Sequence, residues 1–521
     1  MAAAPCTPST FTDTISLFGG KVLTTTAALV TNYSASVSAL DRYTQPPIEV
    51  RDASFCNITV TYTHPNQGDT LIVEAWLPSP AEKWNDRLQA VGGGGWVAGR
   101  SVQAYGTMAG AVADGYAAVT TDAGLGSAQD AGPWALRSEG NLDYVALENL
   151  GSVSLEDEAI IAKSLIKNYY GRGPAYSYWN GCSQGGRQGL MLAQRYPTAY
   201  DGIAAGAPGI QWTDFFPTMF WPQQVMNLLG EYPSPCELQA VTAAVVTACD
   251  KLDGVVDGII ADVDKCLTTF DPFSLVGQKL KCNGDQEDSE VIISEAAAVV
   301  ANATWQGRRN AQGVQVWPGL DPGTDITSGV ATTNCTLGTC VGVPLPIATQ
   351  WLTLFVARDP DFDLSNLTHA EFDWLAHQGQ QRYGSFIGTD DPDLSAFHGA
   401  GGKLVTFHGL VDQLLPPKGS VNYYKKVSGV IPEVDDFYRH FEGPGLGHCG
   451  IMGTSGLPVG LFDQLRAWVE NGTAPDQTRV DITNLEGETQ RRILCPYPQK
   501  AVFDKDCGAT GDEKCWSCGK E

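Results

Sequence analysis

Three separated motifs carry the residue types needed for nucleophilic catalysis. Residues 181–186 read Gly-Cys-Ser-Gln-Gly-Gly, a Gly-x-Ser-x-Gly turn that lifts the hydroxyl of Ser183 clear of a sheet. A serine hydroxyl is a weak nucleophile unless a base removes its proton and an acid orients that base. The candidate base is His448, in a glycine-rich stretch late in the chain, and the candidate acid is Asp412, which follows a short apolar run. Their order along the chain, Ser, Asp, His, favours one catalytic triad.

Each of the three residues also has a plainer interpretation. A lone Gly-x-Ser-x-Gly often occurs by chance, Asp412 alone could be a turn residue, and His448 alone could be a loop histidine. His408 is a weaker alternative for the base, since it lies too near Asp412 in the sequence. Three candidates in the right order, each at the end of a strand-like run, make the triad the favoured hypothesis.

The reaction also requires hydrogen-bond donors aimed at the oxyanion that forms when the serine attacks. One is the backbone N–H of Gln184, the residue after the nucleophile. The second is expected from the consecutive glycines at residues 92–95, with Gly93 and Gly94 as the candidates. The plain alternative is that these glycines form only a tight turn. Removing one such donor typically lowers the rate by about 100- to 1,000-fold.

Two cysteines adjoin the proposed triad. Cys182 directly precedes Ser183, and Cys449 directly follows His448. If the serine and the histidine are catalytic partners, these cysteines lie close enough to form a disulfide. Such a bond would tie the nucleophile to the base covalently.

Alternating patterns predict the elements that must position these residues. Apolar runs typical of strands and apolar faces typical of helices alternate up to residue 208 and resume near residue 403. This alternation predicts an α/β fold with a parallel sheet, and together with the serine turn it predicts an α/β-hydrolase. Strands are predicted at 70–77, 87–91, 115–121, 175–180 and 403–407, and helices at 156–170 and 187–195.

A long segment interrupts the alternation, and we expect it to be a mostly irregular lid. Residues 1–208 are predicted to form the first part of the core, 209–398 the lid, and 399–521 the second part of the core with a disulfide-bonded tail. The lid carries aromatic side chains that could stack on a substrate ring, or that could simply pack in the lid's own core. These are Trp212, Phe215, Phe216 and Trp221.

The net charge limits which kinds of molecule the protein could bind, and the cysteine content indicates its cellular compartment. A net charge of −25 argues against binding to nucleic acid or to an anionic membrane surface, and no apolar run is long enough to span a bilayer. The 14 cysteines and six glycosylation sequons favour a secreted, extracellular glycoprotein. The sequons lie at Asn32, Asn57, Asn302, Asn334, Asn366 and Asn471. Residues 1–6 show no apolar signal core, so we expect a mature chain whose signal peptide has been replaced by a start codon and a short leader.

The motifs resemble those of the fungal tannase and feruloyl esterase family. The resemblance rests on Cys-Ser at 182–183, His-Gly-x-x-Asp at 408–412, His-Cys at 448–449 and Leu-Cys-Pro-Tyr-Pro at 494–498, and it covers nearly the whole chain. It implies that the three candidates form the triad and that the two adjoining cysteines form a disulfide.

An acidic loop at residues 249–259 resembles a second feature of this family. The resemblance implies a structural Ca²⁺ in the lid and no organic cofactor. Calcium takes about six to eight oxygen ligands. The expected ligands are the side chains of Asp250, Asp253 and Asp257 and the backbone carbonyls of Val255 and Ile259. Without the resemblance, a solvated acidic turn would be the favoured interpretation, because the spacing is not that of an EF-hand.

Six further disulfides are expected. Cys249–Cys266 would close the acidic loop, and Cys335–Cys340 would close a short hairpin. The other expected pairs are Cys6–Cys56, Cys236–Cys282, Cys495–Cys518 and Cys507–Cys515.

The resemblance implies a secreted serine esterase that hydrolyses feruloyl esters of plant cell-wall polysaccharides through an acyl-enzyme. Its partners would be small aromatic esters and feruloylated cell-wall oligosaccharides, with no nucleic acid and no membrane, and the chain would be a monomer or a homodimer. A tannase acting on galloyl esters is the alternative within the enzyme class. A non-catalytic, calcium-dependent wall-binding protein is the alternative of another class, and the intact triad argues against it.

Overall fold

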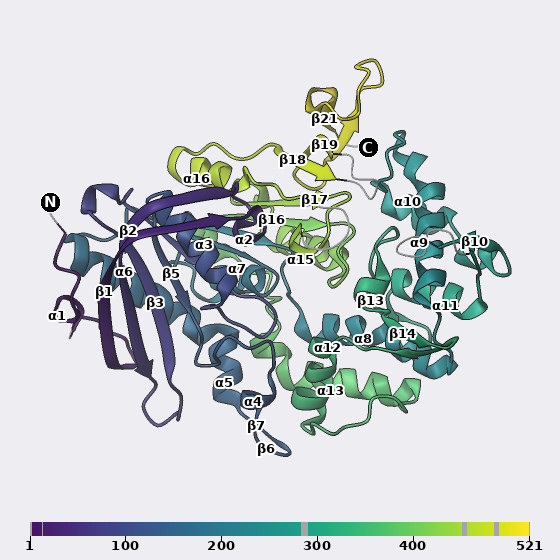
Figure 1. Ribbon diagram of the computed structural model, residues 1–521, viewed down its shortest axis with the longest axis horizontal. Coiled ribbons are helices and arrows are strands. Elements are labelled where there is room, and N and C mark those ends of the chain that lie inside the picture. Colours follow the sequence, from purple (N-terminus) through teal and green to yellow (C-terminus); the bar gives the residue numbers. More distant parts are fainter. Residues whose placement is uncertain (1–2, 13, 283–289, 451–455, 484–488, 520–521) are drawn as a thin grey trace.

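A nine-stranded mixed sheet forms the centre of the molecule, in the order β1-β2-β3-β5-β4-β8-β9-β16-β17 (Figure 1). The computed structural model describes residues 3–12, 14–282, 290–450, 456–483 and 489–519. The strands from β1 to β5 pair antiparallel, whereas those from β5 to β17 pair parallel. The strands are β1 (Lys21–Val37), β2 (Ile48–Thr63), β3 (Leu71–Pro78), β4 (Arg87–Val91), β5 (Ala117–Thr121), β8 (Tyr176–Cys182), β9 (Gly202–Gly206), β16 (Lys403–Gly409) and β17 (Tyr438–Gly443).

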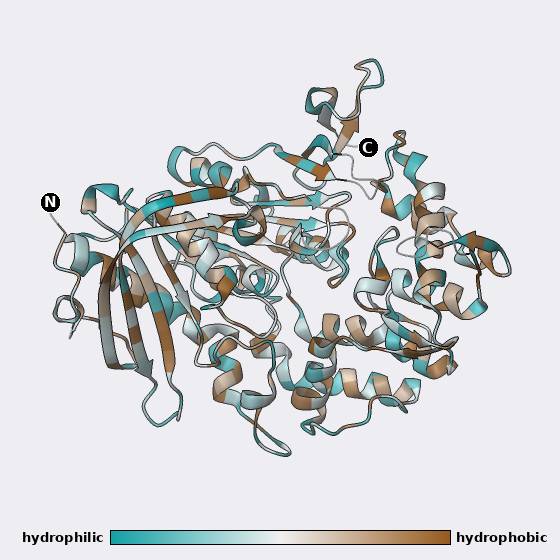
Figure 2. Ribbon diagram, in the orientation of Figure 1, coloured by the Kyte–Doolittle hydropathy of each residue, from teal (hydrophilic) through white to brown (hydrophobic). Residues whose placement is uncertain are grey.

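Helices cover both faces of this sheet, because each face is apolar and must be removed from water. The apolar sides of α3 and α16 pack on one face, and those of α6, α7 and α15 pack on the other. Figure 2 shows hydrophobic residues along the strands and hydrophilic residues on the outer loops. These helices are α3 (Val102–Ala113), α6 (Ser154–Tyr170), α7 (Gln184–Arg195), α15 (Pro417–Val430) and α16 (Leu461–Asn471).

The structure confirms the predicted α/β fold and each strand and helix predicted in the core, within a few residues at the ends. It also contains a long hairpin, β1–β2, that was not predicted. The strands of this hairpin are 17 and 16 residues long, and much of β1 is exposed. Their many threonines and serines give no clean alternation of polar and apolar residues, which explains why the pattern was missed.

The lid is largely helical, which corrects the expectation of a mostly irregular segment. Helix α8 is buried on nearly all sides and contains Pro217 and Pro222, so it lacks the one-sided apolar stripe of a surface helix. The helices are α8 (Trp212–Leu229), α9 (Pro235–Cys249), α10 (Val263–Thr269), α11 (Glu295–Gln306), α12 (Pro346–Gln350), the π-helix η6 (Trp351–Ala357) and α13 (His369–Ile387). Short hairpins join them: β10 (Lys279–Lys281) with β11 (Glu290–Ile292), β12 (Arg308–Arg309) with β13 (Gln315–Trp317), and β14 (Thr333–Thr336) with β15 (Thr339–Gly342).

Further short helices and strands lie before the lid, at its end and in the tail. Before the lid they are α1 (Pro8–Phe11), α2 (Ala39–Arg42), α4 (Gly132–Ala135), β6 (Leu136–Ser138), β7 (Asn141–Leu142), α5 (Tyr144–Glu148) and the π-helix η2 (Asn149–Val153). At the end of the lid lies α14 (Ser395–Gly399), and the tail carries the strands β18 (Thr478–Thr483), β19 (Thr489–Leu494), β20 (Lys500–Phe503) and β21 (Trp516–Gly519). Within the described ranges, the helices are too short or too polar for any one of them to cross a bilayer.

All seven expected disulfides are present. The sequon asparagines differ in exposure, which bears on whether a glycan could be attached. Those at 32, 334, 366 and 471 are exposed, whereas those at 57 and 302 are half-buried. Asn57 also lies within β2, paired with a strand on each side, where a glycan has little room. Glycosylation remains a prediction, strongest for the four exposed sites.

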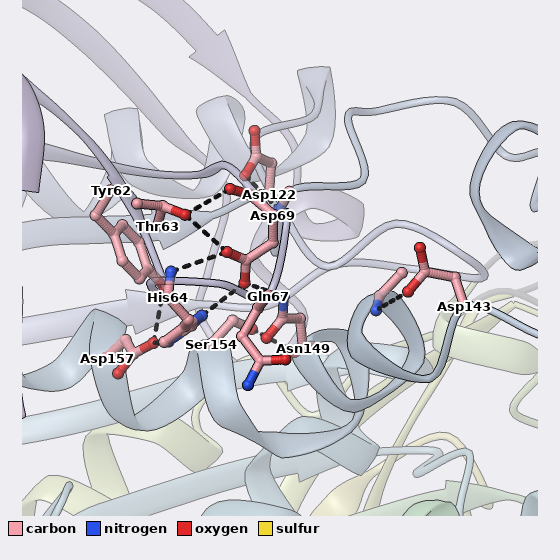
Figure 3. A network of polar contacts seen from close by, with 12 residues as sticks. Tyr62, Thr63, His64, Gln67, Asp69, Asp122, Asp143, Asn149, Ser154 and Asp157 are labelled. Carbon is pink, nitrogen blue, oxygen red and sulfur yellow. Dashed lines mark hydrogen bonds and ion pairs between the residues drawn. The ribbon is translucent and has the colours of Figure 1, made fainter. Parts of the chain in front are cut away.

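A histidine held between two aspartates ties the β2–β3 turn to the helices beneath it (Figure 3). His64 Nδ1 lies 2.6 Å from Asp69 Oδ2, and its Nε2 lies 3.0 Å from Asp157 Oδ2 on α6. Tyr62 donates to Asp157 at 3.1 Å, and Asn149 of η2 donates to Asp69 at 3.0 Å. Burial alone would lower the pKa of His64, but the hydrogen bond to Asp69 and the charge of Asp157 outweigh it and raise that pKa above 6.5.

Replacing His64 with glutamine should destabilise the protein mainly at mildly acidic pH. The folded-state pKa of His64 is raised, so its stabilising effect is complete below about pH 6.5 and is lost as the pH rises through the folded-state pKa. We expect His64→Gln to lower the Tm by about 1–3 °C at pH 5.5 and by less at pH 9. His377→Gln, at an exposed histidine of α13, is the control. Equal losses at both pH values would contradict the assignment.

Candidate active site

The sharp turn at Ser183 is the centre of the candidate site. Ser183 lies between β8 and α7 with φ 60° and ψ −117°, a strained conformation for a residue other than glycine. Its N–H donates to the carbonyl of Gly206 at 3.0 Å. A Cβ on Gly181 would lie 2.6 Å from the carbonyl carbon of Gly185, and one on Gly186 would lie 2.4 Å from the Gly206 oxygen. Glycine is therefore required at positions 181 and 186. At Gly185, the second glycine of the motif, a Cβ would make a tighter than normal contact of 3.1 Å with the carbonyl oxygen of Gly93.

Asp412 and His448 form a buried hydrogen-bonded pair. Asp412 Oδ2 lies 2.7 Å from His448 Nδ1, and Asp412 Oδ1 accepts the N–H groups of Leu414 and Leu415 at 2.8 Å each. Burial alone would raise the pKa of Asp412, but His448 and a second histidine hold it well below its usual range. The acid is therefore ionised and orients the imidazole through Nδ1, so that Nε2 is the nitrogen that can serve as base.

His408, the weaker alternative for the base, is a second partner of Asp412. Its Nε2 lies 3.0 Å from Asp412 Oδ2, and its Nδ1 lies 2.8 Å from the hydroxyl of Ser420. The ring is 1% exposed and does not line the cavity that contains Ser183 and His448. His408 is thus placed to hold the acid rather than to act on a substrate.

A disulfide joins the residue before the nucleophile to the residue after the base, as predicted. Cys182 and Cys449 are bonded, with Cα atoms 6.0 Å apart, although 267 positions separate them in the chain. Ser183 and His448 line one cavity together with both cysteines. The bond therefore limits how far the strand that carries Ser183 can separate from the loop that carries His448.

The structure distinguishes the two glycines proposed as oxyanion donors. The N–H of Gly93 donates to Gln188 Oε1 at 3.0 Å, so the prediction is wrong for Gly93. Gly94, by contrast, lines the cavity beside Ser183. Gln184 is the first residue of α7, a position at which the backbone N–H has no acceptor within the helix. Gly94 and Gln184 therefore stay as the predicted donors.

A cavity of about 220 Å³ opens beside Ser183. Residues of the lid form one side of it, which we call the lid wall: Trp212, Phe215, Phe216, Met219 and Ile347. Three of the four aromatic residues proposed for substrate binding thus line the cavity. Trp221 does not, because it lies further along α8 and packs against His369 and Phe372.

Several residues of the cavity were not identified from the sequence. Leu414 and Leu415 lie two and three positions after Asp412. Met219 lies one helical turn from Phe215 and Phe216, a spacing that would have indicated it if the lid had been predicted as helical. A second group of cavity residues comes from the core and is polar. We call it the core wall: Tyr43, Gln103 and Gln129.

The acidic loop is present, but its expected ligands do not converge. The three carboxylates accept backbone N–H groups at 2.9 to 3.1 Å: Asp253 from Val255, Asp250 from Asp257, and Asp257 from Ile259. Asp257 also forms an ion pair with Arg492 of β19, whose pKa burial lowers to about 10, so the guanidinium stays charged. In the described ranges, no three or more His, Cys, Asp or Glu side chains are grouped so that they could hold a metal. The carboxylates are held by backbone N–H groups and by Arg492, and calcium in this loop stays a prediction.

Removing the disulfide beside the triad should impair catalysis more than folding. In the double variant Cys182→Ala/Cys449→Ala, we expect kcat/KM to fall by about 100-fold, because a base displaced by about 1 Å loses its alignment with the nucleophile. Far-UV circular dichroism and Tm report whether the fold survives. Cys335→Ala/Cys340→Ala, which removes a hairpin disulfide of the lid, is the matched control. Full activity of the first double variant would show that the triad holds its geometry without the bond.

Comparison with known proteins agrees with this geometry. The family described as tannase and feruloyl esterase matches residues 56–516. A probable feruloyl esterase of Arthroderma benhamiae is 40% identical over 453 residues, which cover 85% of this chain and 82% of that protein. The tannase of Aspergillus oryzae is 27% identical over 518 residues, covering 88% and 85% of the two chains. The solved structure of a tannin acyl hydrolase from Aspergillus niger has a TM-score of 0.86 at 28% identity and covers 99% of this chain and 95% of that one. Feruloyl esterase B from Aspergillus oryzae has a TM-score of 0.77 at 25% identity, with 98% and 99% covered. With a serine turn, a buried acid–histidine pair and a linking disulfide in place, the chain belongs to the tannase and feruloyl esterase family of carboxylic ester hydrolases.

Proposed function

We propose that this protein is a secreted serine esterase that hydrolyses feruloyl esters of plant cell-wall saccharides. The observation that carries the proposal is a single cavity that contains Ser183 and His448 beside the aromatic lid wall. Relatives named feruloyl esterase and tannase support the reaction class.

The residues of the triad have distinct roles in this proposal. His448 takes the proton of Ser183 as the serine attacks the ester carbonyl, and Asp412 stabilises the imidazolium that forms. The N–H groups of Gly94 and Gln184 stabilise the oxyanion. His448 then gives its proton to the leaving alcohol, and an acyl-enzyme remains on Ser183. In the second half of the reaction, His448 activates water, which releases the acid and restores the serine.

The lid wall favours a feruloyl group over a galloyl group. Ferulate carries one hydroxyl and one methoxy group on its ring, whereas gallate carries three hydroxyls. The five side chains of the lid wall are aromatic or aliphatic, and none of them bears a charge or a hydroxyl. Each buried hydroxyl that finds no partner costs about 1–3 kcal/mol. Galloyl esters therefore stay the alternative substrate rather than the favoured one.

Two further features support the class and the compartment. A non-catalytic wall-binding protein would have no use for the strained turn at Ser183 or for the buried Asp412–His448 pair, both of which are costly to maintain. Seven disulfides favour an oxidising, extracellular compartment.

A panel of methyl esters tests the proposed substrate. We expect kcat/KM to be at least about tenfold higher for methyl ferulate than for methyl gallate, because the apolar lid wall leaves galloyl hydroxyls without partners. Ser183→Ala should abolish turnover of both esters and labelling by a fluorophosphonate probe. A preference for methyl gallate would favour the tannase alternative. Failure of the wild-type protein to be labelled would falsify the esterase assignment.

Calcium in the acidic loop remains a proposal that rests on the family resemblance and on charge. Three carboxylates lie in the loop, and Arg492 offsets one of them. If a divalent cation offsets the other two, excess chelator should lower the Tm by several degrees, and added Ca²⁺ should restore it. Asp253→Asn should reduce this response to chelator. An unchanged Tm of the wild-type protein would contradict the calcium proposal and would leave Arg492 as the charge that compensates the loop carboxylates.

A further inference from the structure

Tyr43 lines the catalytic cavity but has no part in the steps described above. Tyr43 is 5% exposed. It lies before residues 56–516, the part of the chain that matches the family model. The hydroxyl is not sealed within the protein, and within the part of the chain that the structure describes it has no hydrogen-bond partner. Burial raises the pKa of this hydroxyl, with a further contribution from Asp41, so it stays protonated and can donate a hydrogen bond.

The backbone at Tyr43 is strained. It has φ 55° and ψ −73°, and the N–H of Thr44 donates to the carbonyl of Arg42 at 2.7 Å, which makes a γ-turn with Tyr43 at its apex. A residue other than glycine in such a conformation costs about 1–3 kcal/mol and persists only where its surroundings impose it. Strained residues cluster at ligand-binding and active sites, and this one lies at the catalytic cavity.

The surroundings that impose this turn come from the strand that carries the nucleophile. The side-chain amide of Asn180 donates to the carbonyl of Arg42 at 3.0 Å, and the hydroxyl of Thr44 donates to Asn180 Oδ1 at 2.9 Å. Asn180 and Thr44 are fully buried. Asn180 lies in β8, three positions before Ser183. Tyr43 is therefore positioned relative to the nucleophile, although the two lie far apart in the sequence.

The core wall and the lid wall differ in chemistry. Tyr43 belongs to the core wall, next to Gln103 of α3, whose amide donates to the carbonyl of Leu40 in α2 at 3.3 Å. These side chains can hydrogen-bond with a bound molecule, whereas the lid wall offers only apolar contact. Figure 1 shows that α2 and α3 belong to the core beside the sheet, while α8 and α12 belong to the lid.

An ester bound at Ser183 extends in two directions from its carbonyl carbon, the acyl group to one side and the alcohol to the other. An aromatic acyl group suits the lid wall. When the alcohol is a sugar, it carries several hydroxyls. The free-energy cost of removing these hydroxyls from water is smaller where the protein offers hydrogen-bond partners.

We propose that Tyr43 binds the alcohol half of the substrate, by donating a hydrogen bond from its hydroxyl to a hydroxyl of the leaving sugar. This inference rests on the proposed function. In this inference, the core wall determines which alcohol the enzyme prefers in its substrate, and the lid wall determines which acyl group it prefers. Tyr43 thereby distinguishes a sugar ester from a simple alkyl ester of the same acid.

Two esters with the same acyl group test the inference. Tyr43→Phe removes only the hydroxyl, and we expect it to lower kcat/KM for a feruloyl arabinose ester by about 5- to 10-fold, as the loss of one hydrogen bond would. For methyl ferulate, which has no sugar hydroxyl, the change should be less than about twofold. Phe215→Leu, in the lid wall, is the matched control and should lower kcat/KM for both esters to a similar extent.

The results of this experiment distinguish a failure of this inference from a failure of the proposed function. Equal effects of Tyr43→Phe on the sugar ester and on methyl ferulate, or no effect on either, would overturn it. So would a loss on methyl ferulate that is absent on methyl cinnamate, since that pattern would place Tyr43 at the acyl ring. A wild-type protein that hydrolyses neither feruloyl ester would instead contradict the proposed function. The Tm of Tyr43→Phe should match that of the wild type, because the γ-turn is held by backbone and Asn180 contacts that the variant retains.

Discussion

Direct backbone contact between three glycine-containing segments is the constraint on which the site depends. A Cβ on Gly92 would lie 2.6 Å from the Cα of Gly185, and one on Gly186 would lie 2.4 Å from the carbonyl oxygen of Gly206. The end of β4, the start of α7 and the end of β9 therefore meet at a distance where only hydrogen atoms fit. This contact brings the residue 94 loop to the nucleophile, and it holds Ser183 in a conformation that an isolated turn would not retain. A side chain at Gly92 or at Gly186 would push α7 away from the strands.

The core supplies the chemistry and the lid supplies apolar contact, and one buried cation connects them. Arg187 lies in α7, one turn after the nucleophile, and donates to the carbonyl of Gly151 in η2 at 2.7 Å. Its guanidinium also lies over the ring of Trp212, 4.9 Å from the centroid. Burial lowers the pKa of Arg187 to about 9. The helix that begins at the catalytic turn therefore also supports Trp212, the first residue of the lid wall.

The features that could be predicted from the sequence are those that local backbone geometry or family motifs determine. The serine turn, the order of the triad and the disulfides belong to this group. The helices of the lid could not be predicted in this way. Helix α8 is apolar on nearly all sides, so its sequence shows no helical alternation of polar and apolar residues. The choice between Gly93 and Gly94 depends on the side chain of Gln188, which approaches from another segment. Tyr43 could not be identified from the sequence, because its position is set by the hydrogen bonds of its neighbours Arg42 and Thr44 with Asn180, more than 130 residues away.

The Cys182–Cys449 bond has a consequence for the effect of proteolysis on the site. The three lid disulfides, Cys236–Cys282, Cys249–Cys266 and Cys335–Cys340, all lie between its two ends, and the other three lie wholly outside them. Residues 182–449, which include the whole lid and part of the core, thus form a covalent ring that closes at the catalytic centre. A single peptide cut anywhere in that ring leaves the nucleophile and the base on two different polypeptides that remain one molecule. Nicking of the lid therefore does not by itself separate the catalytic residues.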